Sequence, residues 1–270
     1  MSRGAGGAGE SDSPRDPGAG VQVLRRLLLR AHLSVALAAA VFIAAMAASG
    51  AVLACEEAVL SVWGIRTRVE EGAGGRIVAE SDRREIVGSR FESEIALGPS
   101  GPERFFERVR DLHRWLAFPS GSERTGRMLT GAANLALLFL LLTGALLWVP
   151  WPLSRRALAA NLNFPTGRGR PGGRARRLRL HRAIGVWALL PLAVISATGA
   201  VLSFPSLGDR LYPIVGVAIP GGEESAPEVV LQAHTGELWG LVGRAMAGVA
   251  ALAALAMIWT GATSALRRRR

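Results

Sequence analysis

The chain has 270 residues, of which half are hydrophobic, and its formal net charge at pH 7 is +11. The apolar residues gather in four blocks without Asp, Glu or Arg, at residues 33–55, 128–154, 183–208 and 245–266. Each block exceeds the roughly 20 residues that a helix needs to cross a bilayer. Such blocks argue against a soluble domain, because soluble core helices are rarely apolar on every face.

The positive charge is unevenly distributed between the connections. Residues 1–30 carry five Arg and three acidic residues, residues 151–182 carry nine Arg and no acid, and the chain ends in four Arg. Acidic residues outnumber Arg in the connections 55–127 and 209–237. Basic loops stay on the cytoplasmic side, so we expect both termini and residues 151–182 to be cytoplasmic. Topology accounts for the charge, and no nucleic-acid partner is expected.

The first third of the chain predicts a membrane anchor followed by an outer insertion. Residues 1–23 are rich in Gly, Ala, Ser and Pro and predict a disordered N-terminus, and residues 24–55 predict the first transmembrane helix. Cys55, the single cysteine, leaves one alternative, a lipoprotein cleavage site after Ala54. We prefer an uncleaved anchor, because Leu53 is bulky for such a site and the apolar block is long.

Residues 56–125 predict a small α+β insertion on the outer side. Apolar residues alternate along 63–69 and again along 91–97, as in half-buried strands, and the glycine-rich turn 72–75 follows the first run. Pro102 then opens a helix whose apolar stripe from Phe106 to Leu116 includes His113.

The rest of the chain predicts three more spans. Their expected order is a transmembrane helix at 126–151, a basic cytoplasmic loop at 152–180, a transmembrane helix at 181–207, an extracytoplasmic loop at 208–232, a transmembrane helix with an outer extension at 233–266, and a cytoplasmic Arg tail at 267–270. The third span contains Pro191, which predicts a kink. The predicted fold is an all-α membrane protein, a four-transmembrane-helix bundle with the small α+β extracytoplasmic insertion.

An internal repeat relates the two halves of the chain. His32 precedes Ser49-Gly50 by 17 residues, and His181 precedes Thr198-Gly199 by the same 17. The pairs Gly126-Arg127 and Thr143-Gly144 recur 117 residues later as Gly243-Arg244 and Thr260-Gly261. Both halves begin on the same side, so the pattern predicts two parallel two-helix repeats about an axis along the membrane normal.

All four histidines lie close to the ends of apolar blocks. His32 and His181 are expected at the cytoplasmic face, and His113 and His234 on the outer side. A haem iron with two axial histidines needs one imidazole from each of two facing helices, so the pattern favours two haem or metal sites. The alternative is that each histidine is an amphipathic interfacial anchor. Arginines near the membrane surface would offset haem propionate charge, namely Arg30, Arg179, Arg182 and Arg244.

Two further features bear on this interpretation. A straight helix would lift His234 ~15 Å beyond Arg244, so electron transfer to an inner haem would require the outer segments to fold back, or a third carrier. The Ser/Thr-Gly pair in each span indicates close helix packing or clearance for a flat macrocycle. Asn134 is expected in an interhelical hydrogen bond. No flavin, nicotinamide or nucleotide site is recognisable.

Three segments resemble the PepSY-associated transmembrane helix family. They are Leu112-His113-Arg114-Trp115-Leu116, His181-Arg182-Ala183-Ile184-Gly185-Val186-Trp187 up to Thr198-Gly199, and His234-Thr235-Gly236-Glu237-Leu238-Trp239-Gly240 with Gly243-Arg244. The resemblance covers roughly residues 24–270 and implies a bacterial inner-membrane protein with four helices and an outer PepSY-like insertion. Some members are ferrisiderophore reductases thought to hold b-type haems, which implies haem-ligand roles for His32, His113, His181 and His234.

The leading hypothesis is a haem-b protein, with two haems, that passes electrons across the inner membrane to a ferric chelate such as a ferric siderophore. Its donor would be a membrane quinol or a separate reductase, and it would then be an oxidoreductase of the ferric-chelate reductase type. The alternative is a non-catalytic PepSY-type module that binds an envelope partner or a peptidase. A transporter is disfavoured, because the spans hold almost no ionisable groups away from their ends.

Overall fold

The computed structural model describes residues 17–62, 68–72, 76–80, 101–165, 173–218 and 225–266. Four long helices dominate this part of the chain, α1 (Pro17–Leu53), α4 (Glu123–Trp148), α6 (Gly173–Ser203) and α9 (Gly240–Leu266). The shorter elements are α2 (Glu56–Val62), α3 (Gly101–Trp115), α5 (Arg155–Leu162), α7 (Pro205–Ala218), α8 (Ala226–Thr235), the 3₁₀ helix η1 (Glu237–Trp239), and the antiparallel strands β1 (Arg68–Gly72) and β2 (Arg76–Glu80).

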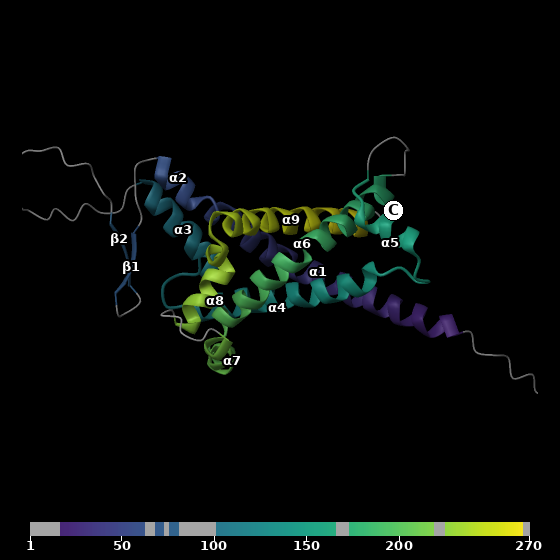
Figure 1. Cartoon of the computed structure of the whole chain (residues 1–270), viewed down its shortest axis with the longest axis horizontal. Helices are drawn as coiled ribbons and strands as arrows, with labels where there is room; N and C mark the ends of the chain where they lie inside the picture. The colour runs from purple at the N-terminus through teal and green to yellow at the C-terminus, as the bar shows by residue number, and fades with distance from the viewer. Residues whose placement is uncertain are drawn as a thin grey trace, which may run out of the picture.

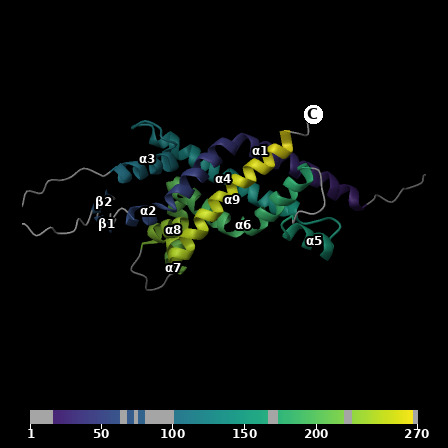
Figure 2. The ribbon, with the colours of Figure 1, turned by 90° about the horizontal axis from the view of Figure 1, so that it is seen from above.

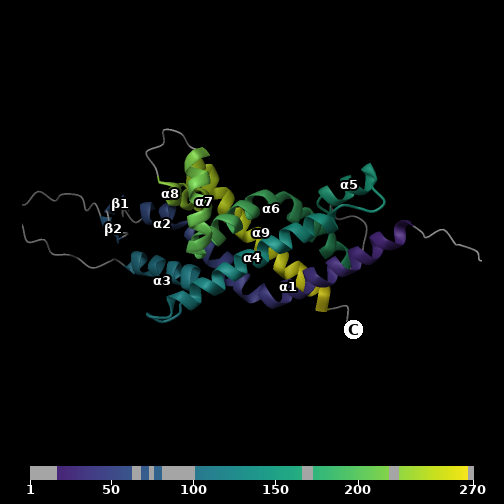
Figure 3. The ribbon, with the colours of Figure 1, turned by 90° about the horizontal axis from the view of Figure 1, so that it is seen from below.

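The four long helices form a bundle in the order α1–α4–α6–α9. Helix α1 packs on α4 and α9, and α6 packs on the same two helices from the other side. Figures 1 and 2 show that the start of α1 and the end of α9 lie at the same end of the bundle as α5. Helices α2, α3, α7 and α8 gather at the opposite end (Figure 3). We call these two ends the α5 end and the α3–α8 end.

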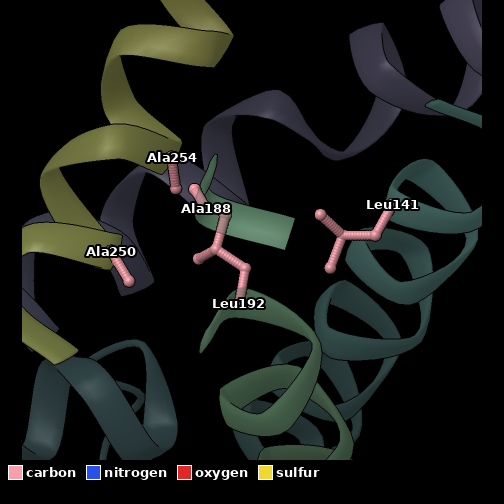
Figure 4. Packing of buried hydrophobic residues seen from close by; sticks show 5 residues of the cluster. All are labelled: Leu141, Ala188, Leu192, Ala250 and Ala254. Carbon is pink, nitrogen blue, oxygen red and sulfur yellow. The ribbon is translucent and has the colours of Figure 1, made fainter. Parts of the chain in front are cut away.

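The side chains of the bundle are sorted as in a membrane protein. The core cluster contains three alanines and two leucines from α4, α6 and α9 (Figure 4), namely Leu141, Ala188, Leu192, Ala250 and Ala254. Large apolar side chains point outward instead, and Val41 and Leu190 are 76% and 75% exposed. Small residues inside let helices approach closely where lipid supplies the apolar surroundings. All four helices are long and apolar enough to cross a membrane, so the chain is a multi-pass membrane protein.

The elements of the structure coincide with the predicted segments in some places and differ from them in others. The helix predicted from Pro102 is α3, and the strand pair brackets the predicted glycine turn with its first strand at Arg68. The expected strand at 91–97 and most of the run 63–69 lie outside the described residues. Helix α1 begins at Pro17, so the stretch 17–23, expected to be disordered, is helical. The loop expected at 208–232 holds most of α7 and the first turns of α8.

The outer extension predicted from residue 233 does not continue the helix of the fourth span in a straight line. Helix α8 ends at Thr235, Gly236 has a left-handed φ of +85°, and α9 begins only at Gly240. The backbone turns back on itself so closely that a Cβ at Gly243 would lie 2.1 Å from the Gly236 carbonyl oxygen. Only glycine tolerates such an approach. The fold-back brings His234 down against α6 instead of lifting it away from the bundle.

The connection from α3 to α4 turns back in the same way. A Cβ at Gly126 would lie 2.2 Å from the carbonyl oxygen of Trp115. Trp115 is the second residue after His113, and Gly236 is the second residue after His234. The glycine of each Gly-Arg pair therefore packs against the carbonyl oxygen of the second residue after a histidine. The four-residue difference between the two histidine-to-Gly-Arg spacings falls in the connection from Leu116 to Ser122, which is longer than its counterpart.

Substitution of Gly126 or Gly243 by Ala should destabilise the protein by about 1–3 kcal/mol, because the added methyl group collides with a carbonyl oxygen that cannot move independently. The thermal unfolding midpoint in detergent measures this effect. Gly101→Ala is the matched control, since no atom lies within 4 Å of a Cβ at Gly101. Unchanged midpoints for Gly126→Ala and Gly243→Ala would contradict the close approach of these two glycines to the carbonyl oxygens of Trp115 and Gly236.

Candidate functional site

At the α5 end of the bundle, two histidines contact hydroxyl groups on neighbouring helices. The Nδ1 atom of His32 on α1 lies 2.8 Å from Oγ1 of Thr143 on α4. The Nδ1 atom of His181 on α6 lies 3.1 Å from Oγ1 of Thr260 on α9, and also 3.1 Å from the carbonyl oxygen of Met257. The pairing thus joins α1 to α4 and α6 to α9.

At the α3–α8 end, the other two histidines make the same kind of contact. His113 on α3 places Nδ1 3.0 Å from Ser49 Oγ and 3.1 Å from the Met46 carbonyl oxygen, both on α1. His234 on α8 places Nδ1 3.1 Å from Thr198 Oγ1 and 2.9 Å from the carbonyl oxygen of Ile195, both on α6.

The acceptors fix the tautomer of all four rings. Carbonyl oxygens can only accept, so the Nδ1 atoms of His113, His181 and His234 must carry the proton. For His32 the partner is Thr143, whose hydroxyl already donates to the Phe139 carbonyl oxygen at 2.8 Å and therefore accepts from the ring. In a neutral imidazole this leaves a free lone pair on Nε2. A ring held at Nδ1 with Nε2 free is the usual form of a metal-ligating histidine.

The two rings at the α3–α8 end are neutral at pH 7. Burial, with a smaller contribution from the neighbouring His234, lowers the pKa of the His113 imidazole to about 4. Burial also lowers the pKa of His234, with Arg114 contributing in the same direction. Only a neutral imidazole can coordinate a metal, so these surroundings hold both rings in the ligating form.

The spacing of His113 and His234 suits one ion between them. Their ring centroids are 6.1 Å apart, with an angle of 53° between the ring planes. Two imidazoles that ligate one ion from opposite sides, each at about 2.0 Å, have centroids roughly 6 Å apart. Across the described residues, no three His, Cys, Asp or Glu side chains gather as a metal centre. A pair of imidazoles without further protein ligands suits haem iron, because the porphyrin provides the remaining ligands.

The glycines of the Ser/Thr-Gly pairs leave room for the imidazoles. A Cβ at Gly50 would lie 3.2 Å from Cε1 of His113, and Cβ atoms at Gly144 and Gly261 would lie 3.6 and 3.4 Å from Cε1 of His32 and His181. At the fourth pair, a Cβ at Gly199 would meet Asn134 instead. The hydroxyl of every pair bonds an imidazole ring. In three of the four pairs, the glycine also faces the edge of that ring.

The arginines expected near haem propionates occupy different surroundings. Arg30 and Arg182 are exposed at the α5 end, and Arg182 lies close enough to His181 to interact with it electrostatically. Arg244 forms an ion pair with Glu57 of α2, so its charge already has a protein partner. Arg114, which was not singled out from the sequence, interacts electrostatically with both His113 and His234. Its position directly after His113 was the available signal.

Sequence reasoning also underestimated the hydroxyl residues. Ser49, Thr143, Thr198 and Thr260 were expected to serve helix packing or clearance, yet each accepts a hydrogen bond from a histidine on another helix. The 17-residue spacing hid these contacts, because it links a histidine to the hydroxyl at the far end of its own span. Asn134 is buried, and its side-chain amide lies against Gly199 of α6. The interhelical hydrogen bond expected for it stays a prediction.

A known family matches most of the chain. Residues 29–228 match the family described as the PepSY-associated TM region. The match contains His32, His113 and His181 and ends six residues before His234. A comparison with curated proteins gave no match. Since the matched segment is well over half of the 270 residues, the chain belongs to the PepSY-associated TM region family.

Proposed function

We propose that this protein is a haem-b membrane protein that passes electrons across a bacterial inner membrane. The observation that carries the proposal is the shared contact of the four histidines, each bonded through Nδ1 to another helix, which leaves the lone pair of a neutral ring on Nε2. Haem iron alternates between the ferric and ferrous states and so carries one electron at a time.

Each end of the bundle supplies one pair of ligands in this proposal. His113 and His234 would hold one haem at the α3–α8 end, and His32 and His181 would hold another at the α5 end. His32 and Ser49, which bonds His113, are 17 residues apart on α1, or about 25 Å along the helix. The two sites would therefore lie near opposite faces of a hydrocarbon core about 30 Å thick.

The two pairs follow from a duplicated architecture. Helix α3 packs on α1 and α4, and α8 packs on α6 and α9. In each half, one histidine on a spanning helix bonds the next spanning helix, as His32 and His181 do. The other histidine lies on a short folded-back helix and bonds a spanning helix, as His113 and His234 do. This correspondence supports the two parallel repeats inferred from the sequence. A duplicated half with two histidines gives two sites at which each half contributes one ligand.

The surrounding residues would set the orientation and the potential of the bound group. The hydroxyl and carbonyl acceptors make each Nε2 more basic and fix the plane of its ring. Arg114 beside the first pair and Arg182 beside the second would offset propionate charge, and Arg30 and Arg244 are further candidates. The small α+β insertion at the α3–α8 end would face outward, with the termini in the cytoplasm, as the basic charge near the α5 end favours.

The terminal acceptor in this proposal is ferric iron bound to a chelator, such as a siderophore, on the outer side. The electron donor is a membrane quinol or a separate reductase. The alternative, a non-catalytic PepSY-type module that binds an envelope partner or peptidase, requires no bound group.

The visible spectrum of the full-length protein purified in detergent is the first test. We expect the bands of low-spin b-type haem after dithionite reduction, at about two haems per chain. A protein that stays colourless after expression with ample haem would overturn the proposal and favour the binding module.

Replacing one histidine separates the two sites. His113→Ala or His234→Ala should abolish one haem component and halve the haem content. Either change removes an axial ligand from the haem at the α3–α8 end and leaves both ligands of the haem at the α5 end in place. Reduced-minus-oxidised spectra and a haem assay measure this outcome. Loss of both components, or of neither, would argue against paired sites.

The hydroxyl partners have unequal importance. Thr143→Val should weaken haem binding at the α5 end about 10-fold or more, because Thr143 accepts the hydrogen bond from His32. Removal of a group that hydrogen-bonds a ligating histidine typically costs about 10–100-fold in affinity. Thr198→Val should have a smaller effect, since the Ile195 carbonyl oxygen still holds His234. Haem titration of the apoprotein compares the two, and equal effects would contradict the assignment.

A further inference from the structure

Arg127 is a half-buried cation that the hydrogen bonds of the histidines do not involve. It lies in the second turn of α4, and its guanidinium carbon lies over the ring of Trp115, 5.0 Å from the ring centroid. In the described part of the chain, the Nε atom of Arg127 is buried without a hydrogen-bond partner. A buried donor of a charged group is costly when it has no acceptor, so this arrangement indicates that an acceptor binds there.

The end of α3 connects Arg127 to the imidazole pair at the α3–α8 end. Trp115, which lies under the guanidinium, is the second residue after His113. Thr130, three residues further along α4, donates a hydrogen bond to the Arg114 carbonyl oxygen at 3.3 Å. The guanidinium of Arg114 in turn interacts electrostatically with both imidazoles of the pair. Arg127 is therefore a second cation within a few residues of this pair.

The packing of the bundle places α4 and α9 on the two open sides of the pair. His113 bonds α1, and His234 bonds α6. Helices α1 and α6 each pack on both α4 and α9, so α1 and α6 lie on one diagonal of the bundle, and α4 and α9 lie on the other. A flat group held between the two imidazoles would therefore have one edge on the α4 side and the opposite edge on the α9 side.

The internal repeat provides one arginine on each of these two sides, and the two arginines differ. Arg244 of α9 lies 117 residues after Arg127 of α4, and each directly follows the glycine of its Gly-Arg pair. Arg244 forms an ion pair with Glu57. Arg127 interacts electrostatically with Glu123, one turn earlier on α4, but that carboxylate accepts a hydrogen bond from the Gly121 backbone. Only the arginine on the α4 side thus keeps an unbonded buried donor.

We infer that Arg127 binds a carboxylate of the group held by His113 and His234, and that Arg244, its counterpart in the repeat, does not. The inference rests on the proposed function, in which that group is haem b and the carboxylate is a propionate. The planar donors of a guanidinium match the two oxygens of a carboxylate. Because Arg127 is already stacked on Trp115, its side chain loses little freedom on binding. A propionate contact on the α4 side alone would also give the macrocycle one orientation in the site.

Binding of haem and of haem dimethyl ester to the full-length apoprotein tests the inference, because the ester has the same ring and iron but no carboxylate. The signal to follow is the haem component that His113→Ala abolishes. Arg127→Gln should raise the dissociation constant for haem about 10-fold or more, the loss expected for a charge-assisted hydrogen bond. It should leave the constant for the ester within about twofold. Arg244→Gln is the matched control and should leave both constants within about twofold.

The midpoint potential of the same haem component is the second readout. A nearby positive charge favours ferrous over ferric haem, because the ferric form carries one more positive charge. Arg127→Gln should therefore lower this potential. Arg127→Lys keeps the charge but loses the planar donors, so it should weaken haem binding and lower the potential less. Arg127→Lys is also the variant to measure if Arg127→Gln does not fold.

Three outcomes would overturn this inference and leave the proposed function intact. Equal losses of affinity for haem and for its ester in Arg127→Gln would show that Arg127 only supports the fold. Unchanged haem binding in Arg127→Gln would show that no carboxylate binds there. A loss of equal size in Arg244→Gln would show that the two sides are equivalent. A wild-type protein that binds neither haem nor the ester would instead overturn the proposed function and this inference with it.

Discussion

The contact between a glycine and a carbonyl oxygen at the α3–α8 end is the constraint on which the candidate site depends. Gly126 and Gly243 let the chain before α4 and α9 fold back against the bundle. Without that approach, α3 and α8 would continue away from the spans, and His113 and His234 would stand far from α1 and α6. With it, two short helices that do not cross the membrane insert their histidines between helices that do.

The hydrogen bonds of the histidines then act on this scaffold in a uniform way. A span hydroxyl donates to the carbonyl one turn earlier in its own helix and accepts from an imidazole of another helix. A neutral hydroxyl in an apolar environment needs such a partner, because an unpaired polar group there is costly. The same bond that satisfies the hydroxyl also fixes the ring, so helix packing and the orientation of the imidazoles depend on the same four residues.

The sequence by itself determined the four spans and the helix that carries His113. These features rest on local hydrophobicity and on residue spacing, which the chain expresses directly. The sequence did not predict the break at Gly236, because a glycine within a largely apolar segment is compatible both with a continuing helix and with a left-handed turn that reverses the chain. Nor did it assign the partners of the histidines, since the bonds join His32 to Thr143 and His234 to Thr198 across different helices. Only the tertiary structure decided these pairings, because they depend on which helices become neighbours and at what height.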